Sequence, residues 1–444
     1  MDLGLHQKKE IRIMTQQTSS LGRRAFLKTS ALAGGGLLIN FSWLSSLACP
    51  KGVKAIADEL VTMNGYLKIA TNGIVTIMSP NPEGGQNIKT SMPMIVAEEL
   101  DIDWKKVIVE QAPLNTGLYT RQFIGGSQAI RMGWRNLRMA GATARHMLRE
   151  AASVAWVVPI EEVTTEIGML YHKKSGKSAN YGEMASAASK LTVPREVKLK
   201  DKKEFRIIGK SAKNVDLPNI VTGKAPFGLD TKREGMLIAM IVHPPAFGMK
   251  LKSVDDIRAR VMPGIKDIFT VKIFNDDYER QFFDTTSFNE VVAVVGKTTW
   301  EVMKAKAALK IQWEPFSEYT IQRATGGGAG GGRAQTTTIP AGLENTTSHN
   351  AKMAEMMTRP ANVVRKDGDP EMAFKNAALI IERTYNGPFL AHNCMEPMNF
   401  FAHVTADKVE LVGPLQKAEL TERALATRLG IPLEKIDDSE EHNV

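Results

Sequence analysis

The chain has 444 residues, a formal net charge of +9 and only two cysteines, Cys49 and Cys394. Its length is sufficient for two or three domains with proper cores. Two cysteines exclude a four-cysteine zinc site or a cysteine-ligated iron–sulfur cluster within this chain, and they argue against a disulfide framework. Because the basic residues are spread along the chain without blocks interleaved with aromatic residues, no nucleic-acid partner is expected.

Residues 1–48 have the pattern of an export signal. Arg23 and Arg24 stand directly before Ala25-Phe26-Leu27-Lys28, and an uncharged stretch follows from 29 to 48. This closely resembles a Tat signal, although Gly22 replaces the usual Ser or Thr. We therefore expect the Tat translocase as a partner and a periplasmic location, with membrane association left open. The alternative is a transmembrane anchor, which three consecutive glycines and several serines argue against.

Residues 60–194 are predicted to alternate short strands with helices and to contain two glycine corners. The first corner follows a predicted strand at 73–78, precedes a helix predicted at about 94–100, and reads Glu83-Gly84-Gly85-Gln86. Two glycines let the backbone approach a ligand closely, and the helix N-terminus after them favours an anion. An ordinary strand–loop–helix corner is the alternative for this loop taken alone.

The second corner, Gly125-Gly126-Ser127, opens a helix that is predicted to run to about Val154, with Ser127 as its cap. Two such corners suit a ligand that carries phosphate. A neighbouring face of this helix is basic, and its members are Arg131, Arg135, Arg138, Arg145 and Arg149. That face is interpreted either as a solvated flank or as a basic wall facing an acidic ligand.

Residues 205–318 are predicted to form a compact α+β module. Buried strands are expected at 236–243, 268–274 and 291–296, and a capping box at Thr298 opens a helix. The following stretch, 319–360, is predicted as a Gly/Ser/Thr-rich linker. Its glycine run lacks the Gly-Lys-Ser/Thr ending of a phosphate-binding loop.

Residues 361–444 are predicted to contain a short helix capped at Asp369 and a strand at 379–385. If the next segment were extended, one face would carry His392, Cys394 and Glu396, which mimics a metal site. Three ligands of mixed hardness on one strand rarely converge on one ion, so no protein-ligated metal is expected here.

Taken in order, these motifs resemble the molybdopterin-binding large subunit of the xanthine dehydrogenase/aldehyde oxidase superfamily. The similarity is strongest to the Tat-exported branch of isoquinoline 1-oxidoreductase beta subunits and related aldehyde dehydrogenases. The residues that carry it beyond the two corners include Thr90, Glu98-Glu99-Leu100, Leu137-Arg138, Gly141-Ala142, Thr222-Gly223-Lys224-Ala225, Gly235-Met236, Pro244-Pro245, His392, Met395-Glu396-Pro397-Met398-Asn399, Ala402-His403 and Gln416. One departure is Asn87, which stands where the family pattern has a glycine.

The resemblance implies an α+β fold in which molybdopterin-binding α/β segments flank an a/b hammerhead domain at 205–318. It implies a molybdenum–molybdopterin cofactor, normally the cytosine dinucleotide, whose metal has no protein ligand. The cofactor-binding residues carried over are Gly84, Gly85, Gln86, Gly125, Gly126, Ser127 and Glu396. The implied substrates are aldehydes or N-heterocycles, and the implied electron acceptor is a small [2Fe-2S] subunit.

A helix–turn–strand unit is predicted to recur at 418–436, where the family continues into a loop over the metal and a domain with a catalytic glutamate base. That base is expected beyond Val444, so no catalytic residue is assigned here. We expect a C-terminally truncated or frame-disrupted large subunit. The alternatives are a non-catalytic remnant, an exported binding module that keeps part of the fold, or an unrelated exported α/β binding protein.

Overall fold

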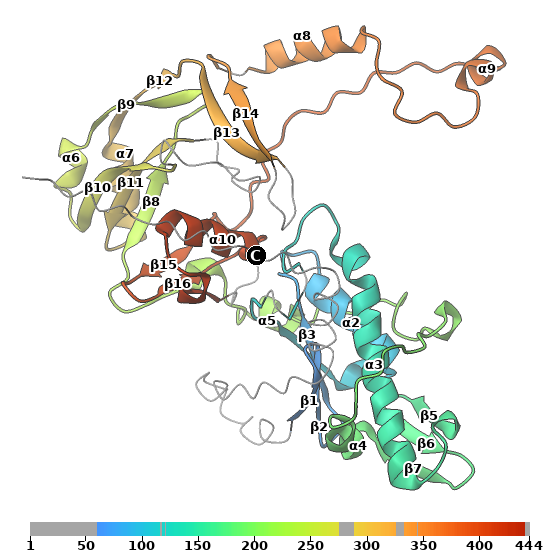
Figure 1. Cartoon of the computed structure of the whole chain (residues 1–444). Coiled ribbons are helices and arrows are strands. Elements are labelled where there is room, and N and C mark those ends of the chain that lie inside the picture. The colour runs from blue at the N-terminus through green and yellow to red at the C-terminus, as the bar shows by residue number, and fades with distance from the viewer. Residues whose placement is uncertain are drawn as a thin grey trace, which may run out of the picture. The chain divides into compact units, whose positions relative to one another are not determined.

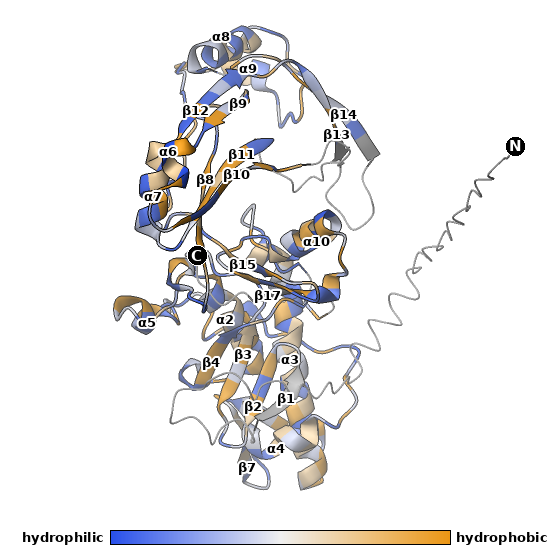
Figure 2. Ribbon diagram, turned by 90° about the vertical axis from the view of Figure 1, so that its left-hand side faces the viewer, coloured by the Kyte–Doolittle hydropathy of each residue, from blue (hydrophilic) through white to orange (hydrophobic). Residues whose placement is uncertain are grey.

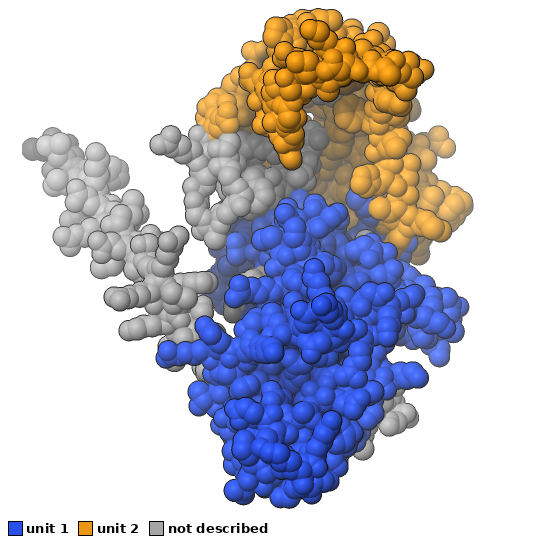
Figure 3. Space-filling model, turned by 90° about the vertical axis from the view of Figure 1, so that its right-hand side faces the viewer, with its two compact units in different colours: residues 1–230, 398–444 blue, residues 231–397 orange. Residues whose placement is uncertain are grey.

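A computed structural model describes residues 60–115, 118–119, 121–274, 288–325, 333–343 and 345–439, so the predicted export signal lies outside it. Two compact units are distinguished, one comprising the chain up to Asp230 together with Met398 onward, the other Thr231–Pro397 (Figure 3). Among the described residues, no helix combines the length and the hydropathy that a membrane span requires.

Unit 1 begins with a four-stranded sheet in the order β1-β2-β3-β4 (Figure 1). The strands are β1 (Leu60–Asn64), β2 (Leu67–Ala70), β3 (Val75–Ser79) and β4 (Val107–Gln111). The first three pair antiparallel, and β4 runs parallel to β3. A parallel pair needs a crossover connection, which helix α2 (Ile88–Leu100) and the 3-10 turn η3 (Trp104–Lys106) provide.

Helix α2 begins at Ile88, earlier than the sequence predicts, and Pro93 lies inside it. The long helix α3 (Ala129–Trp156) packs against α2 and agrees with the predicted helix to within two residues at either end. The close approach requires Gly141, because a Cβ there would lie 2.3 Å from the Val96 carbonyl oxygen. Both helices bury their apolar stripes in one core with β2 and β3.

A small antiparallel sheet follows α3. Its strands are β5 (Val163–Glu166), β6 (Met169–His172) and β7 (Lys177–Asn180), with the turn η4 (Ile160–Glu162) before them. Helix α4 (Tyr181–Ala188) then begins at a reciprocal capping box between Asn180 and Glu183. The side chain of Tyr181 is fully buried and its hydroxyl donates to the Leu100 carbonyl at 2.8 Å, which ties α4 to the end of α2.

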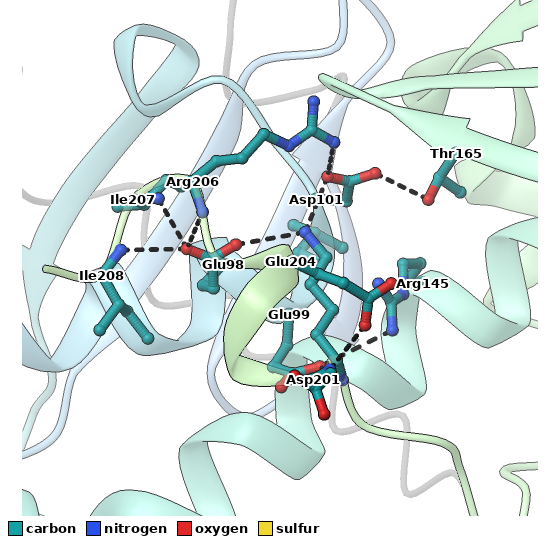
Figure 4. A network of polar contacts seen from close by, with 12 residues as sticks. Glu98, Glu99, Asp101, Arg145, Thr165, Asp201, Glu204, Arg206, Ile207 and Ile208 are labelled. Carbon is teal, nitrogen blue, oxygen red and sulfur yellow. Dashed lines mark hydrogen bonds and ion pairs between the residues drawn. The ribbon is translucent and has the colours of Figure 1, made fainter. Parts of the chain in front are cut away.

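Residues 195–216, called the strap below, contain only the 3-10 turn η5 (Lys202–Glu204) and are held against α2 by buried charges (Figure 4). The Glu98 carboxylate accepts hydrogen bonds from the backbone N–H groups of Arg206, Ile207 and Ile208 at 2.9, 2.6 and 3.0 Å. The Lys200 ammonium lies 3.2 Å from Glu98 and 2.8 Å from Asp101. The strap is therefore fixed to the C-terminal end of α2.

The short elements α5 (Leu217–Val221) and η6 (Gly228–Asp230) follow the strap, and unit 1 resumes with β15 (Phe401–Val404). Strand β16 (Val409–Val412) pairs antiparallel with β15 and parallel with β17 (Ile436–Ser439). The crossover consists of α10 (Ala418–Leu429) and η7 (Leu433–Lys435). This confirms the predicted recurrence, because β2, β3, α2, η3 and β4 have the same order and pairing.

Unit 2 contains a sheet in the order β10-β11-β8 and a two-stranded sheet of β12 and β9. Their bounds are β8 (Ile238–Val242), β9 (Met249–Asp255), β10 (Ile265–Lys272), β11 (Glu290–Gly296) and β12 (Lys310–Pro315). Helices α6 (Ile257–Arg260) and α7 (Thr299–Ala308) pack on an aliphatic core, and the apolar run of β8 stands out in Figure 2. The predicted cap is present, since Thr298 Oγ1 accepts from Glu301 N.

The rest of unit 2 departs from the sequence expectation in two places. The stretch predicted as a linker contains the antiparallel hairpin of β13 (Tyr319–Thr325) and β14 (Arg333–Ile339) and the helix α8 (Thr346–Met357). Helix α9 (Pro370–Lys375) is capped by Asp369 as predicted, since the Asp369 carboxylate accepts from Met372 N. The strand predicted at 379–385 does not form: Ile381 is 70% exposed, and no described strand pairs with it.

Candidate functional site

Three loops of unit 1 meet at one place, called the three-loop junction below. They are residues 80–87 after β3, residues 121–128 before α3, and residues 413–417 after β16. The Asn81 side-chain amide donates to the carbonyls of Arg121 and Phe123 at 3.2 and 2.8 Å. The Ile124 N–H donates to the Gln416 carbonyl at 2.9 Å. The two predicted glycine corners and the C-terminal Gln416 are thus brought together.

Gln122 is the centre of this junction and was not singled out from the sequence. Its side chain is fully buried, with Nε2 donating to the carbonyls of Pro80 and Pro113 and Oε1 accepting from Asn115 N. Its backbone N–H donates to the Glu419 carboxylate of α10 at 3.1 Å. A buried amide that uses both its donor and its acceptor fixes loops far apart in sequence. The only sequence signal is a polar residue beside the apolar pair Phe123-Ile124.

The N-terminus of α2 is already satisfied within the chain. The Glu83 carboxylate accepts from Gly85 N, Asn87 N and Lys89 N at 2.7, 3.0 and 2.9 Å. A carboxylate at a helix N-terminus takes the place that an anionic ligand would take. We therefore do not place a phosphate at this helix N-terminus, and the part of the first corner in ligand binding stays a prediction. The Glu83 carboxylate, two to six residues upstream of the N–H groups that it accepts from, also explains why α2 begins earlier than predicted.

Gln86 lies exposed at the tip of the first corner with an amide of defined orientation. Its Oε1 accepts from Gly84 N at 2.6 Å and its Nε2 donates to the Pro82 carbonyl at 3.3 Å. Because a backbone N–H can only donate and a carbonyl can only accept, the amide cannot be flipped. Gln86 therefore presents the second N–H of its amide outward as a donor. Gly84 permits this arrangement, since a Cβ there would lie 2.8 Å from Ile124 Cδ1.

The second corner is open. Gly125, Gly126 and Ser127 are exposed, and Gly126 and Ser127 have φ values of 62° and 53°. The N-cap of α3 is Gln128, whose side chain makes no capping hydrogen bond, and no acidic residue lies in the first turn. Ser127, predicted as the cap, precedes the N-cap instead. Of the two corners, this one offers backbone donors and a helix dipole to a ligand.

The basic face of α3 divides into two groups. Arg138 donates to the Glu99 carboxylate and the Lys200 carbonyl at 2.7 and 2.6 Å, and Arg149 donates to the carbonyls of Val163 and Ile160. Arg145 lies 3.7 Å from Glu99 as well. These three arginines hold the fold together and are neither a solvated flank nor a ligand wall. Arg131 and Arg135, close to the helix N-terminus, are exposed.

No group of three His, Cys, Asp or Glu side chains within the described ranges has the geometry to hold a metal ion. Cys394 is a free, exposed thiol. Glu396, predicted to belong to the site, lies in unit 2 in a segment without helix or strand. Its relation to the three-loop junction stays a prediction.

Comparison with known proteins matches residues 46–225 and residues 355–440 to two models of a molybdopterin cofactor-binding domain. The beta subunit of isoquinoline 1-oxidoreductase from Brevundimonas diminuta is 32% identical over 67% of this chain and 41% of that protein. The membrane-bound aldehyde dehydrogenase (pyrroloquinoline-quinone) of Gluconacetobacter polyoxogenes is 26% identical over 95% of this chain and 51% of that protein. The chain thus spans about half the length of these relatives.

Among solved structures, the aldehyde oxidoreductase of Desulfovibrio gigas matches 50% of this chain and 25% of that chain with 15% identity and a TM-score of 0.33. A TM-score this low adds nothing to the assignment, which is based on the two domain matches and on the isoquinoline 1-oxidoreductase relative. The chain belongs to the molybdopterin-binding large-subunit family of the xanthine dehydrogenase/aldehyde oxidase superfamily, a family of oxidoreductases.

Proposed function

We propose that this chain is the cofactor-binding subunit of a molybdenum oxidoreductase that oxidises aldehydes or N-heterocycles. The proposed cofactor is molybdenum–molybdopterin in its cytosine dinucleotide form. The three-loop junction carries the proposal, because it joins an open helix N-terminus to an exposed, oriented amide. Names of relatives support the substrate class, since they include an isoquinoline oxidoreductase and an aldehyde dehydrogenase.

The donor set of the second corner fits a dinucleotide pyrophosphate. The first turn of α3 has no side-chain cap and no acidic residue, and Gly125 and Gly126 add backbone without Cβ atoms in front of it. Exposed Arg131 and Arg135 add positive charge on the following turns. Backbone N–H groups, a helix dipole and nearby cations are the features that bind phosphate in proteins. We assign the pyrophosphate to α3 because Glu83 occupies the corresponding position at α2.

Gln86 is assigned to the metal end of the cofactor. Its Oε1 is held by Gly84 N and one N–H of its Nε2 by the Pro82 carbonyl, so its second N–H is available to a hydrogen-bond acceptor. Gly84 and Gly85 allow the backbone to approach closely, Ser127 adds a hydroxyl at the second corner, and Glu396 is proposed as part of the cavity wall. When bound, the cofactor supplies the two-electron redox chemistry, and the protein binds and orients the reactants.

The remaining proposals concern partners and location. Electrons are proposed to pass to a small [2Fe-2S] subunit, in keeping with a chain that has only two cysteines. Export through the Tat translocase to the periplasm is proposed from Arg23 and Arg24. Residues 205–318 are proposed to be the a/b hammerhead domain, for which the sheets formed by β8 to β12 and the helices α6 and α7 are the support.

The test is to purify the chain alone and together with a small [2Fe-2S] subunit of a related oxidoreductase, and to measure molybdenum, pterin and dye reduction. We expect molybdenum and pterin in the purified protein. Dye reduction that depends on an aldehyde or on isoquinoline is expected from a chain extended to the full length of the relatives, with both subunits present. Bound cofactor without turnover would instead favour the exported binding module. Protein without molybdenum or pterin, produced in a host that makes the cofactor, would contradict the proposal.

A further inference from the structure

The first glycine corner departs from the family pattern at Asn87, and the structure explains how this chain accommodates the change. We propose that Asn87 and Asn214 form a positioning pair, through which the strap fixes the direction of the Gln86 loop. Neither residue is assigned to contact the cofactor, so each would act through Gln86. The inference depends on the proposed function for the role of Gln86 but not for the existence of the pair.

The backbone of Asn87 has the conformation that a glycine would have. Its φ and ψ are 63° and 27°, in the left-handed region, directly after Gln86 and at the N-cap of α2. Among residues with a Cβ, Asn is one of the few that enter this region readily, since its short side chain hydrogen-bonds locally. Asn87 therefore keeps the turn of the corner, which an alanine would oppose.

The side chain of Asn87 adds a contact that a glycine cannot make. Its Oδ1 accepts from Asn214 Nδ2 at 2.5 Å. Asn214 has a fixed amide orientation, because its Oδ1 accepts from Asp216 N at 2.7 Å. The neighbouring residues of α2 make parallel contacts with the strap: Lys89 Nζ lies 2.9 Å from Asp216 Oδ1, and Thr90 Oγ1 accepts from Val215 N.

The strap is a firm support for this pair because its other end is anchored in the interior. The carboxylates of Glu98, Glu99 and Asp101 are each 5% exposed or less, and they bind the strap through its backbone N–H groups, Lys200 and Arg206 (Figure 4). The strap thus contacts both ends of α2. Its Asn214 end lies beside the first corner and restrains the residue that follows Gln86.

The test is hydrogen–deuterium exchange of the backbone amides of residues 84–89, followed by mass spectrometry of the cofactor-free 444-residue chain. Asn214→Ala removes the tether to Asn87 together with the contact of Asn214 Oδ1 with Asp216 N inside the strap. Of these two, only the tether reaches the corner, and its net gain of about 1 kcal/mol corresponds to roughly fivefold faster exchange of the loop. Asn87→Gly keeps the left-handed turn and loses the tether, so its loop amides should exchange at the same rate as those of Asn214→Ala. Asn87→Ala also opposes the left-handed turn, which should add a further fivefold to thirtyfold.

The matched control is Asn219→Ala, an exposed asparagine just beyond the strap, which should leave the loop exchange unchanged. The double variant Asn87→Gly with Asn214→Ala should exchange like Asn87→Gly alone. Exchange of Asn214→Ala at the rate of the control, or equal rates for Asn87→Ala and Asn87→Gly, would overturn the proposal. All variants should keep the thermal midpoint within a few degrees, which separates loop release from unfolding.

A second arm repeats the exchange after the cofactor has been loaded. Protection of the loop by cofactor in the wild-type chain, and weaker protection in Asn214→Ala, is the expected result. If the cofactor leaves the wild-type loop unprotected, the assignment of Gln86 fails while the pair itself stands. If both chains gain equal protection, the pair does not position Gln86.

Discussion

Replacing Glu98 tests the claim that buried charges hold the strap on α2. The Glu98 side chain is 1% exposed, accepts three backbone N–H bonds, and lies 3.2 Å from the Lys200 ammonium. Glu98→Ala leaves three backbone N–H groups without their acceptor, although the Lys200 ammonium keeps its ion pair with Asp101. Removal of one partner from a buried ion pair costs roughly 3–5 kcal/mol. We expect about 3 kcal/mol for Glu98→Ala, at the lower end because Asp101 remains.

The same contacts make this stabilisation depend on pH. Burial alone would raise the pKa of Glu98, but the N–H groups of Ile207, Ile208 and Arg206 and the Lys200 charge together hold the pKa below its ordinary value of 4.5. A lowered folded-state pKa means that the stabilisation is complete above that ordinary value and is lost as the pH falls through the folded-state value. Glu98→Gln lacks this titration.

The assay is urea unfolding of the wild-type chain, Glu98→Ala and Glu98→Gln between pH 3 and pH 8, with Glu110→Ala on the exposed face of β4 as the control. We expect the difference in unfolding free energy between the wild type and Glu98→Gln to be constant above about pH 5 and to become smaller below that pH. The control should stay within about 0.5 kcal/mol of the wild type. The reasoning would be refuted if the difference in unfolding free energy between the wild type and Glu98→Gln increased in acid. It would also be refuted if Glu98→Ala lost no more unfolding free energy than the Glu110→Ala control.

Two further predictions concern helix packing and the junction. Gly141→Ala would place a Cβ 2.3 Å from the Val96 carbonyl oxygen and 3.0 Å from Leu100 N, so α2 and α3 must separate, and we expect the free energy of unfolding in urea to fall by about 3 kcal/mol. Gly133→Ala on the same helix meets only flexible side-chain ends and should be nearly neutral. Equal effects of the two substitutions would contradict the packing argument. In a chain extended to the full length of the relatives, Gln86→Ala should lower turnover of the cofactor-loaded enzyme about a hundredfold, as expected when one preorganised hydrogen bond is lost, while the unfolding midpoint changes little. Unchanged kcat with normal molybdenum content would remove Gln86 from the site.

Local patterns allowed much of the fold to be predicted. The spacing of apolar residues in α3, the helix cap at Thr298, and the recurrence of a helix–turn–strand unit near the C-terminus all agree with the structure, although the reciprocal backbone contact of a capping box is not formed at Thr298. These features depend on contacts between residues close in sequence, which periodicity and capping rules describe. The two glycine corners were also found, because glycine pairs before helices are local signals.

Features that depend on distant contacts were not predictable in this way. Gln122 joins loops from both ends of unit 1, and nothing in its neighbourhood indicates a partner 297 residues away at Glu419. The first helix was expected to begin too late, because the carboxylate that accepts from N–H groups at its start belongs to Glu83, in the corner itself. The apolar stretch 379–385 has the composition of a strand, but a strand also needs a neighbour, and none of the described strands pairs with it.

The assignment of the cofactor phosphate to the N-terminus of α3 is the central claim, and Gln128→Glu tests it most directly. The change keeps the shape of the N-cap residue and adds one negative charge at a terminus without an acidic residue in its first turn. A negative charge there should stabilise the helix by about 0.3–1 kcal/mol and should repel a phosphate from the same place.

The measurement is the molybdenum and pterin content of purified Gln128→Glu beside that of the wild type, together with the unfolding midpoint of each. If the phosphate assignment is right, we expect a strong loss of both molybdenum and pterin in a variant that is as stable as the wild type or slightly more so. Wild-type molybdenum and pterin content in a stable Gln128→Glu chain would contradict it.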